Sequence, residues 1–429
     1  MYPAVKLPER EPGFDEDLQA FVEKYIAIWQ ASAADPPALT ATYTVAEQQS
    51  SELETGSLTD SMDKEFRNYP GGKKQQSAWR ERVFATLREF GKTSFRVPDS
   101  HFDIIFSPEY FQSSREFVHK ARGFDPKMGN EALAQALRNV WVMNCLQMFL
   151  GGRPSLTPSI FAYSMLYPYT DNHLDRPELS IKSKEIACRR LGLRLSGEVL
   201  APRDKQEAAV FRLIEMIEGE FPRDAFPGVH SSLLAIHTGQ VQSLSQQHPL
   251  EIPDEQRLLR ISIAKGGSSV LADGWLVAGA LAREEADFFF GYGVMLQLLD
   301  DLQDLPEDRA AGHWTLFTRT AWTKQVESLT NRLWTFMHAV LNSRNCFTSS
   351  RCLEIRDLIR RSSTMLMLRA IAECDELFSS EYLQHMERIS PLRFAYLKRQ
   401  RKEITARFRE AWPAVARRRK LQSVFDLLG

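Results

Sequence analysis

The chain has 429 residues, of which 43% are hydrophobic, and a formal net charge of −1, so it is long enough for one large core or two modest ones. The near-neutral charge gives no indication of a nucleic-acid partner or of an anionic membrane surface. The five cysteines are scattered and form no CxxC pair, and there is neither a secretory leader nor an apolar run of about 18 residues, which predicts a soluble cytoplasmic protein without a disulfide framework or a zinc site.

Apolar residues recur every three or four positions through most of the chain, as in "FVEKYIAIW" and "ALAQALRNVWVMNCLQMFL". Alternating strand patterns are nearly absent, so the spacing predicts an all-α fold. We expect residues 1–140 to form a helical N-terminal extension that is partly irregular around 36–75, where the sequence is polar and weakly periodic. Residues 141–429 are expected to form the functional helical core.

The first of two acidic motifs is "YPYTDNHLDRPE". Asp171 and Asp175 are four residues apart, so on a helix they share one face. Pro168 lies about one turn earlier and is expected to bend or break the helix there. Arg176 follows the motif directly and can pair either with a phosphate or with Asp175.

The second acidic motif is "LQLLDDLQDLPED". Asp300 and Asp304 again share a helix face, with Asp301 beside them, and the preceding "FFFGYGVMLQLL" indicates the end of a buried helix. Carboxylates at this spacing repel one another unless a cation compensates, and Mg²⁺ prefers one or two carboxylates together with phosphate oxygens. Two such motifs opposed across a cavity would hold magnesium and grip a diphosphate. The plainer alternative for either motif alone is a solvated helix turn.

"GYGVMLQLLDDLQDL" resembles the second aspartate-rich motif of the class I isoprenoid synthases, the superfamily of trans-prenyltransferases and terpene synthases. In this resemblance Asp300, Asp301 and Asp304 match the metal-binding acids, and Gln297 matches the glutamine of the motif. The first acidic motif then stands where the first aspartate motif of the superfamily belongs.

Two further stretches resemble helices of the same superfamily. "IHTGQVQSL" and "IAKGGSSVLADG" place Gln240 and Lys265 at positions that contact the diphosphate. The resemblance covers roughly residues 160–320. It implies a helical bundle around a central apolar cavity, a cluster of up to three Mg²⁺ ions and a prenyl diphosphate substrate, and it leaves a homodimer open.

The sequence also departs from the superfamily. The first motif has the DxxxD form instead of DDxxD, and no G-K-R-x-R-P element, which helps bind isopentenyl diphosphate in chain-elongating enzymes, precedes it at the usual distance. The NSE/DTE signature of microbial terpene cyclases is also missing. The missing element for the second diphosphate favours a terpene synthase over a chain-elongating enzyme.

Aromatic residues gather near both acidic motifs. Core packing explains any one of them. Together they suit an apolar pocket whose ring faces stabilise carbocations and exclude water. The residues predicted to line this cavity are Tyr167, Tyr169, Trp275 and Tyr292.

The sequence therefore predicts a Mg²⁺-dependent terpene synthase that ionises an allylic prenyl diphosphate and releases pyrophosphate. The alternatives are a prenyltransferase, either chain-elongating or head-to-head condensing, and a non-catalytic helical binding protein. Asp171, Asp175, Asp300 and Asp304 would hold the metal, with Asp301 in support. The diphosphate contacts would be Arg176, Gln240, Lys265 and Gln297.

Overall fold

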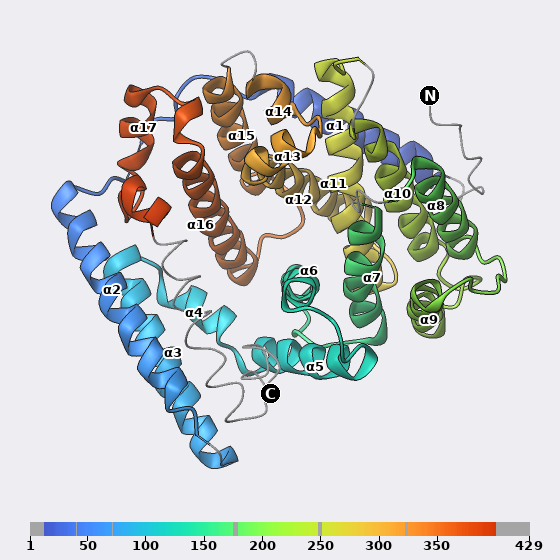
Figure 1. The fold of residues 1–429 in the computed structure, drawn as a ribbon, viewed down its shortest axis with the longest axis horizontal. Coiled ribbons are helices and arrows are strands. Elements are labelled where there is room, and N and C mark those ends of the chain that lie inside the picture. The colour runs from blue at the N-terminus through green and yellow to red at the C-terminus, as the bar shows by residue number, and fades with distance from the viewer. Residues whose placement is uncertain are drawn as a thin grey trace. The chain divides into compact units, whose positions relative to one another are not determined.

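The computed structural model describes residues 13–39, 41–70, 72–174, 179–247, 251–321 and 325–399, with the backbone alone at 73, 171–174 and 181. These residues form α-helices and two short 3-10 helices without any β-strand, which confirms the all-α prediction (Figure 1). The helices in chain order are α1 (Phe14–Ala31), α2 (Val45–Arg67), α3 (Lys73–Phe95), α4 (Asp99–Ile105), α5 (Pro108–Phe124), α6 (Asn130–Phe149), α7 (Pro158–Leu174), α8 (Ile181–Leu195), α9 (Lys205–Glu220), α10 (Pro227–Ser243), η1 (Leu244–Gln246), α11 (Glu255–Ala278), α12 (Arg283–Gln303), α13 (Leu305–Ala311), α14 (Leu316–Ala321), α15 (Val326–Leu341), α16 (Ser350–Glu373), η2 (Asp375–Leu377) and α17 (Ser380–Glu387).

The polar segment 36–75 is more regular than its sequence indicates. Helix α2 occupies Val45–Arg67, so irregular backbone is limited to its described flanks. A capping box starts the helix: the Thr44 hydroxyl accepts a hydrogen bond from the Glu47 backbone N–H, and the Glu47 carboxylate accepts one from the Thr44 N–H. The weak apolar periodicity concealed this helix because local capping, more than a broad apolar face, defines its start.

The chain divides into two compact units, each made from separate stretches of sequence. Unit 1 comprises Met1–Asp35 and Gln112–Leu353, and unit 2 comprises Pro36–Phe111 and Glu354–Gly429. The predicted division between residues 140 and 141 is not one of these boundaries. All the residues predicted from the sequence to form the functional site belong to unit 1.

Helices α11 and α12 form the centre of unit 1. Gly279, with φ of 73°, ends α11 in the left-handed conformation, and its N–H donates to the Trp275 carbonyl at 2.7 Å. A short connection then returns the chain as α12, antiparallel to α11. The aromatic run of α12 is fully enclosed, with Phe288, Phe289 and Phe290 each at most 1% exposed. This buried aromatic run holds the helix that carries the second acidic motif.

Unit 2 packs around its own smaller core. Helices α2 and α3 meet at a cluster in which the Tyr69 and Trp79 rings stack edge to face with centroids 4.9 Å apart. At the other end of α2, Arg393 forms an ion pair with the buried carboxylate of Glu52. This ion pair joins the two sequence segments of the unit.

None of the helices within the described ranges combines the length and the apolar character that a membrane crossing needs.

Candidate active site

Glycine contacts bring three helices of unit 1 close together at the predicted diphosphate residues. A methyl group on Gly239 of α10 would lie 2.9 Å from the Lys265 Cα of α11. A methyl group on Gly266 would overlap the Gln297 side chain and the Gly293 carbonyl of α12. Only glycine permits this approach. The backbones of α10, α11 and α12 therefore meet beside Lys265, the residue predicted to contact a diphosphate.

Asp300 and Asp304 lie at the C-terminal end of α12, and both side chains are exposed. Desolvation nevertheless raises the pKa of both carboxyls, and that of Asp304 reaches about 7 because Asp300 and Asp308 add their negative charges. Both carboxyl groups therefore combine exposure to water with nearby protein atoms that partly desolvate them. Neither carboxylate makes a hydrogen bond or ion pair with any described residue.

Asp301 differs from its neighbours because it points into the protein. Its side chain is 6% exposed and accepts hydrogen bonds from the Ser262 hydroxyl at 2.9 Å and from the Gln297 amide at 2.8 Å. Desolvation raises the pKa of Asp301 to about 7, although both hydrogen bonds act to lower it. Gln297, predicted to contact the diphosphate, therefore donates a hydrogen bond to Asp301, predicted to support the metal site. The hydrogen bond from Ser262 to Asp301 joins α11 to α12.

Two cations act on Asp300. Lys265 on α11 and Arg138 on α6 both lower the pKa of Asp300 against the larger effect of desolvation. Neither cation makes an ion pair or a hydrogen bond with another described residue. Arg138 was not identified from the sequence. Its one available signal was a single arginine in the otherwise apolar stretch "ALAQALRNVWVM".

The first acidic motif is described only in part. Helix α7 continues through Pro168 to Leu174. Of the two expected effects of this proline, a bend or a break, the break does not occur. Asp171 belongs to the last turn of α7, where the backbone alone is described, and Asp175 and Arg176 lie outside the described residues. Among described side chains, no three from His, Cys, Asp and Glu are grouped as a metal ion would need.

Gln240 and Tyr167 each lie close in sequence to another feature of the predicted site. Gln240 follows Gly239 directly on α10, and its side chain is half-buried. Tyr167 is half-buried on α7, four residues before Asp171.

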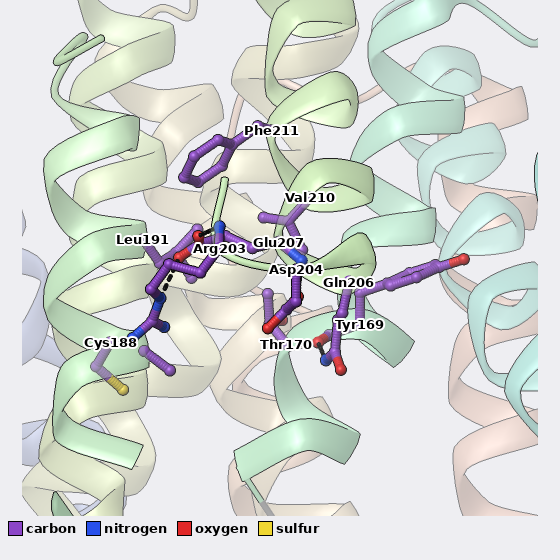
Figure 2. A pocket seen from close by; sticks show the side chains of 11 residues that line it. Tyr169, Thr170, Cys188, Leu191, Arg203, Asp204, Gln206, Glu207, Val210 and Phe211 are labelled. Atoms are coloured by element: carbon purple, nitrogen blue, oxygen red, sulfur yellow. Dashed lines mark hydrogen bonds and ion pairs between the residues drawn. The ribbon is translucent and has the colours of Figure 1, made fainter. Parts of the chain in front are cut away.

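The other three aromatic residues predicted to line one cavity lie in different surroundings. Tyr169 donates its phenol hydrogen to Asp125 at 2.8 Å and borders a pocket formed by the end of α7 with α8 and α9, which Figure 2 shows. Trp275 borders a different pocket with Phe14 of α1. Tyr292 is 4% exposed and lies inside unit 1, where Cys145 and Asp273 act on its phenol. The structure does not bring Tyr169, Trp275 and Tyr292 together.

The pocket beside Tyr169 is mostly apolar, and its polar rim is already paired. Its wall includes Cys188 and Leu191 from α8 and Val210 and Phe211 from α9 (Figure 2). Glu207 on this rim accepts a hydrogen bond from the Arg190 side chain at 2.6 Å. Arg203 on this rim also pairs with Glu207, so the described part of the rim has no unpaired cation for a phosphate.

Comparison with protein-family models, with curated proteins and with solved structures found no match for this chain.

Proposed function

We propose that this protein is a Mg²⁺-dependent isoprenoid synthase of the terpene synthase type, which ionises an allylic prenyl diphosphate. The observation that supports the proposal best is the grouping of charged side chains at the end of α12. It combines two exposed carboxylates, Asp300 and Asp304, with two cations, Lys265 and Arg138. Within the part of the chain that the structure describes, none of these four side chains makes an ion pair or a hydrogen bond. Carboxylates for a metal and cations for a phosphate are the two requirements of metal-assisted diphosphate binding.

The donor set fits Mg²⁺ in its chemistry. Asp300 and Asp304 offer hard oxygen ligands one helical turn apart. Their raised pKa values indicate that the described residues do not fully compensate their charges, and a divalent cation would do so. When bound, Mg²⁺ supplies the positive charge that stabilises pyrophosphate as a leaving group.

The residues of the chain would bind and orient the diphosphate. Lys265 offers a compact ammonium charge, and Arg138 offers a planar guanidinium that can bind two phosphate oxygens at once. Gln240 adjoins the same contact between α10 and α11. Breaking the allylic C–O bond sends its electron pair to the pyrophosphate and leaves a carbocation. Donors already held in place stabilise the developing negative charge without reorganisation.

A terpene synthase is preferred over a chain-elongating prenyltransferase because the sequence lacks a recognisable element for isopentenyl diphosphate. In the preferred reaction the carbocation stays within one substrate molecule, where an alkene of the same chain captures it or a proton is lost. In the alternative reaction it is captured by a second prenyl substrate. The two reactions share the ionisation step and differ only in the acceptor.

The proposal is tested by measuring pyrophosphate release from C10, C15, C20 and C25 prenyl diphosphates, with Mg²⁺ or with a chelator. Each substrate is supplied with and without isopentenyl diphosphate, and the organic products are identified by mass. We expect Mg²⁺-dependent release from one substrate and a hydrocarbon or alcohol of the same carbon number. Release only with isopentenyl diphosphate would establish chain elongation, and a longer product from one substrate alone would establish condensation. If no substrate is turned over or bound, the proposal fails.

A further inference from the structure

A buried hydrogen bond joins α11 to α12 beside the predicted metal ligands. The Ser262 hydroxyl of α11 donates to Oδ2 of Asp301 at 2.9 Å, and the two residues are 3% and 6% exposed. The Gln297 amide donates to Oδ1 of Asp301 at 2.8 Å. Each oxygen of this carboxylate therefore already accepts a hydrogen bond from an uncharged protein donor. In this respect Asp301 differs from Asp300 and Asp304, whose side chains are exposed.

The same hydrogen bond continues a line of close contacts between the two helices. A methyl group on Gly266 would overlap Gln297 and the Gly293 carbonyl, so the two backbones approach as closely as glycine allows. Ser262 lies four residues before Gly266 and therefore on the same face of α11. Asp301 lies four residues after Gln297 on α12, and its hydrogen bond with Ser262 extends the line.

Charged residues of the proposed site adjoin this line of contacts on both helices. Lys265 directly precedes Gly266 on α11. Asp300 directly precedes Asp301 on α12. In an antiparallel pair of helices, residues one position before the line of contacts lie on the same side of both helices. The charge of Lys265 accordingly acts on the Asp300 carboxyl. The hydrogen bond between Ser262 and Asp301 thus joins the two turns that carry this cation and this acid.

We infer that Ser262 is a positioning residue of the proposed metal and diphosphate site, and that it acts through Asp301. This inference rests on the proposed function. Asp301 holds the last turn of α12 against α11 instead of binding the metal, and Asp300 and Asp304 are the metal ligands of this helix. Residues that orient metal ligands through hydrogen bonds typically contribute about 10–100-fold to metal affinity.

The experiment measures the binding of radiolabelled inorganic pyrophosphate to the full chain by equilibrium dialysis, across a series of Mg²⁺ concentrations. Ser262→Ala removes the donor and leaves Asp301 in place, so we expect the half-saturating Mg²⁺ concentration to rise about 10–100-fold, with binding restored at high Mg²⁺. Ser262→Thr keeps the hydroxyl and should remain close to the wild type. Ser268→Ala, the same change at another buried serine of α11, is the matched control and should equal the wild type.

The two possible roles of Asp301 predict different results for Ser262→Ala. If Asp301 bound the metal itself, loss of the serine hydroxyl would free one of its oxygens, and the Mg²⁺ requirement would be unchanged or lower. That result overturns the inference. An equal rise in Ser262→Thr also overturns it, because the effect would not follow the hydroxyl. Thermal melts in chelator check folding, and if Ser262→Ala does not fold, Ser262→Cys, which keeps a weaker donor, is judged by the same criteria.

The behaviour of the wild type separates this inference from the function on which it rests. If the wild type neither binds pyrophosphate with Mg²⁺ nor releases it from any prenyl diphosphate, the proposed function fails and the inference fails with it. If the wild type binds pyrophosphate with Mg²⁺ and Ser262→Ala has the same Mg²⁺ requirement as Ser268→Ala, the inference alone is overturned.

Discussion

The surroundings lower the pKa of two carboxyl groups in unit 2 but raise the pKa of those at the end of α12. In unit 2, Arg393 binds Glu52 through two nitrogens, at 2.8 and 2.5 Å. Asp357 accepts a hydrogen bond from Arg361 at 2.8 Å, pairs with Arg360 and faces His101 at 3.1 Å. Burial tends to raise the pKa of both acids, but the arginines outweigh it and lower the pKa of each below its usual value.

At the end of α12 the balance is reversed. Desolvation raises the pKa of Asp300, Asp301 and Asp304, and Asp308 adds a repelling charge to all three. Lys265 and Arg138 reduce this effect for Asp300 without overcoming it. The difference separates two uses of an acid. A carboxylate that stabilises the fold has its own cation within the chain, whereas the α12 group is left with an excess of negative charge that an external cation can neutralise.

The largest expected effect comes from removing an α12 carboxylate. Asp304→Ala should lower Mg²⁺-dependent pyrophosphate release by about 100-fold or more, beyond the 10–100-fold typical of outer-shell partners of a metal. The same change should not lower the thermal midpoint in chelator, because it removes a repelling charge. Asp224→Ala, at an exposed aspartate in unit 1, is the control and should match the wild type. Unaltered release from Asp304→Ala would remove Asp304 from the proposed site.

The corresponding change in unit 2 should affect stability instead of turnover. Arg393→Ala leaves the Glu52 carboxylate, 8% exposed, without its ion-pair partner, and we expect the free energy of unfolding to fall. Urea denaturation measures this loss. Arg388→Ala is the matched control because Arg388 is exposed and makes no ion pair with a described residue. Equal effects of the two variants would show that the Glu52 pair does not stabilise unit 2.

The close backbone contact between α11 and α12 provides a third test. Gly266→Ala would force a methyl group against Gln297 and the Gly293 carbonyl, which we expect to cost about 2 kcal/mol in the free energy of unfolding. Gly56→Ala in α2 meets nothing within 4 Å and should be stabilising by about 0.5–1 kcal/mol, because alanine favours a helix. Denaturation of both variants measures the difference. A neutral Gly266→Ala would mean that α11 and α12 can separate at this point without loss.

The sequence predicted the helices and the second acidic motif because both depend on local periodicity. The long apolar run before Asp300 indicated a buried helix that ends in acids, and α12 has this form. Contacts between residues on different helices could not be predicted, because they depend on the rotation of each helix about its axis. Trp275 and Asp273 are two residues apart on α11. Because of this rotation, Trp275 contacts Phe14 of α1, whereas Asp273 accepts a hydrogen bond from Asn139 of α6. For the same reason Arg138 was missed. The hydrogen bond between Gln297 and Asp301 lies within α12 at i, i+4 spacing, so the sequence alone could have predicted it.

The smallest expected effect is on the pH dependence of stability, and its sign differs between the two regions. The pKa of Asp304 is about 7 in the folded protein and near 3.8 when unfolded, so between these values the folded state holds more protons. This acid therefore makes the free energy of unfolding fall as the pH rises from about 4 to about 7. The pKa of Asp357 is lowered, so its contribution to stability is present above pH 3.8 and is lost as the pH falls through its folded pKa. Thermal melts of Asp304→Asn and Asp357→Asn across this range, without Mg²⁺, should show a gain at pH 7 for the first and a loss for the second. The Asp304→Asn gain should vanish near pH 4, where the wild-type carboxyl is also uncharged. A loss at pH 7 from both variants would mean that the α12 acids are paired as fully as those of unit 2, and the contrast between the regions would not hold.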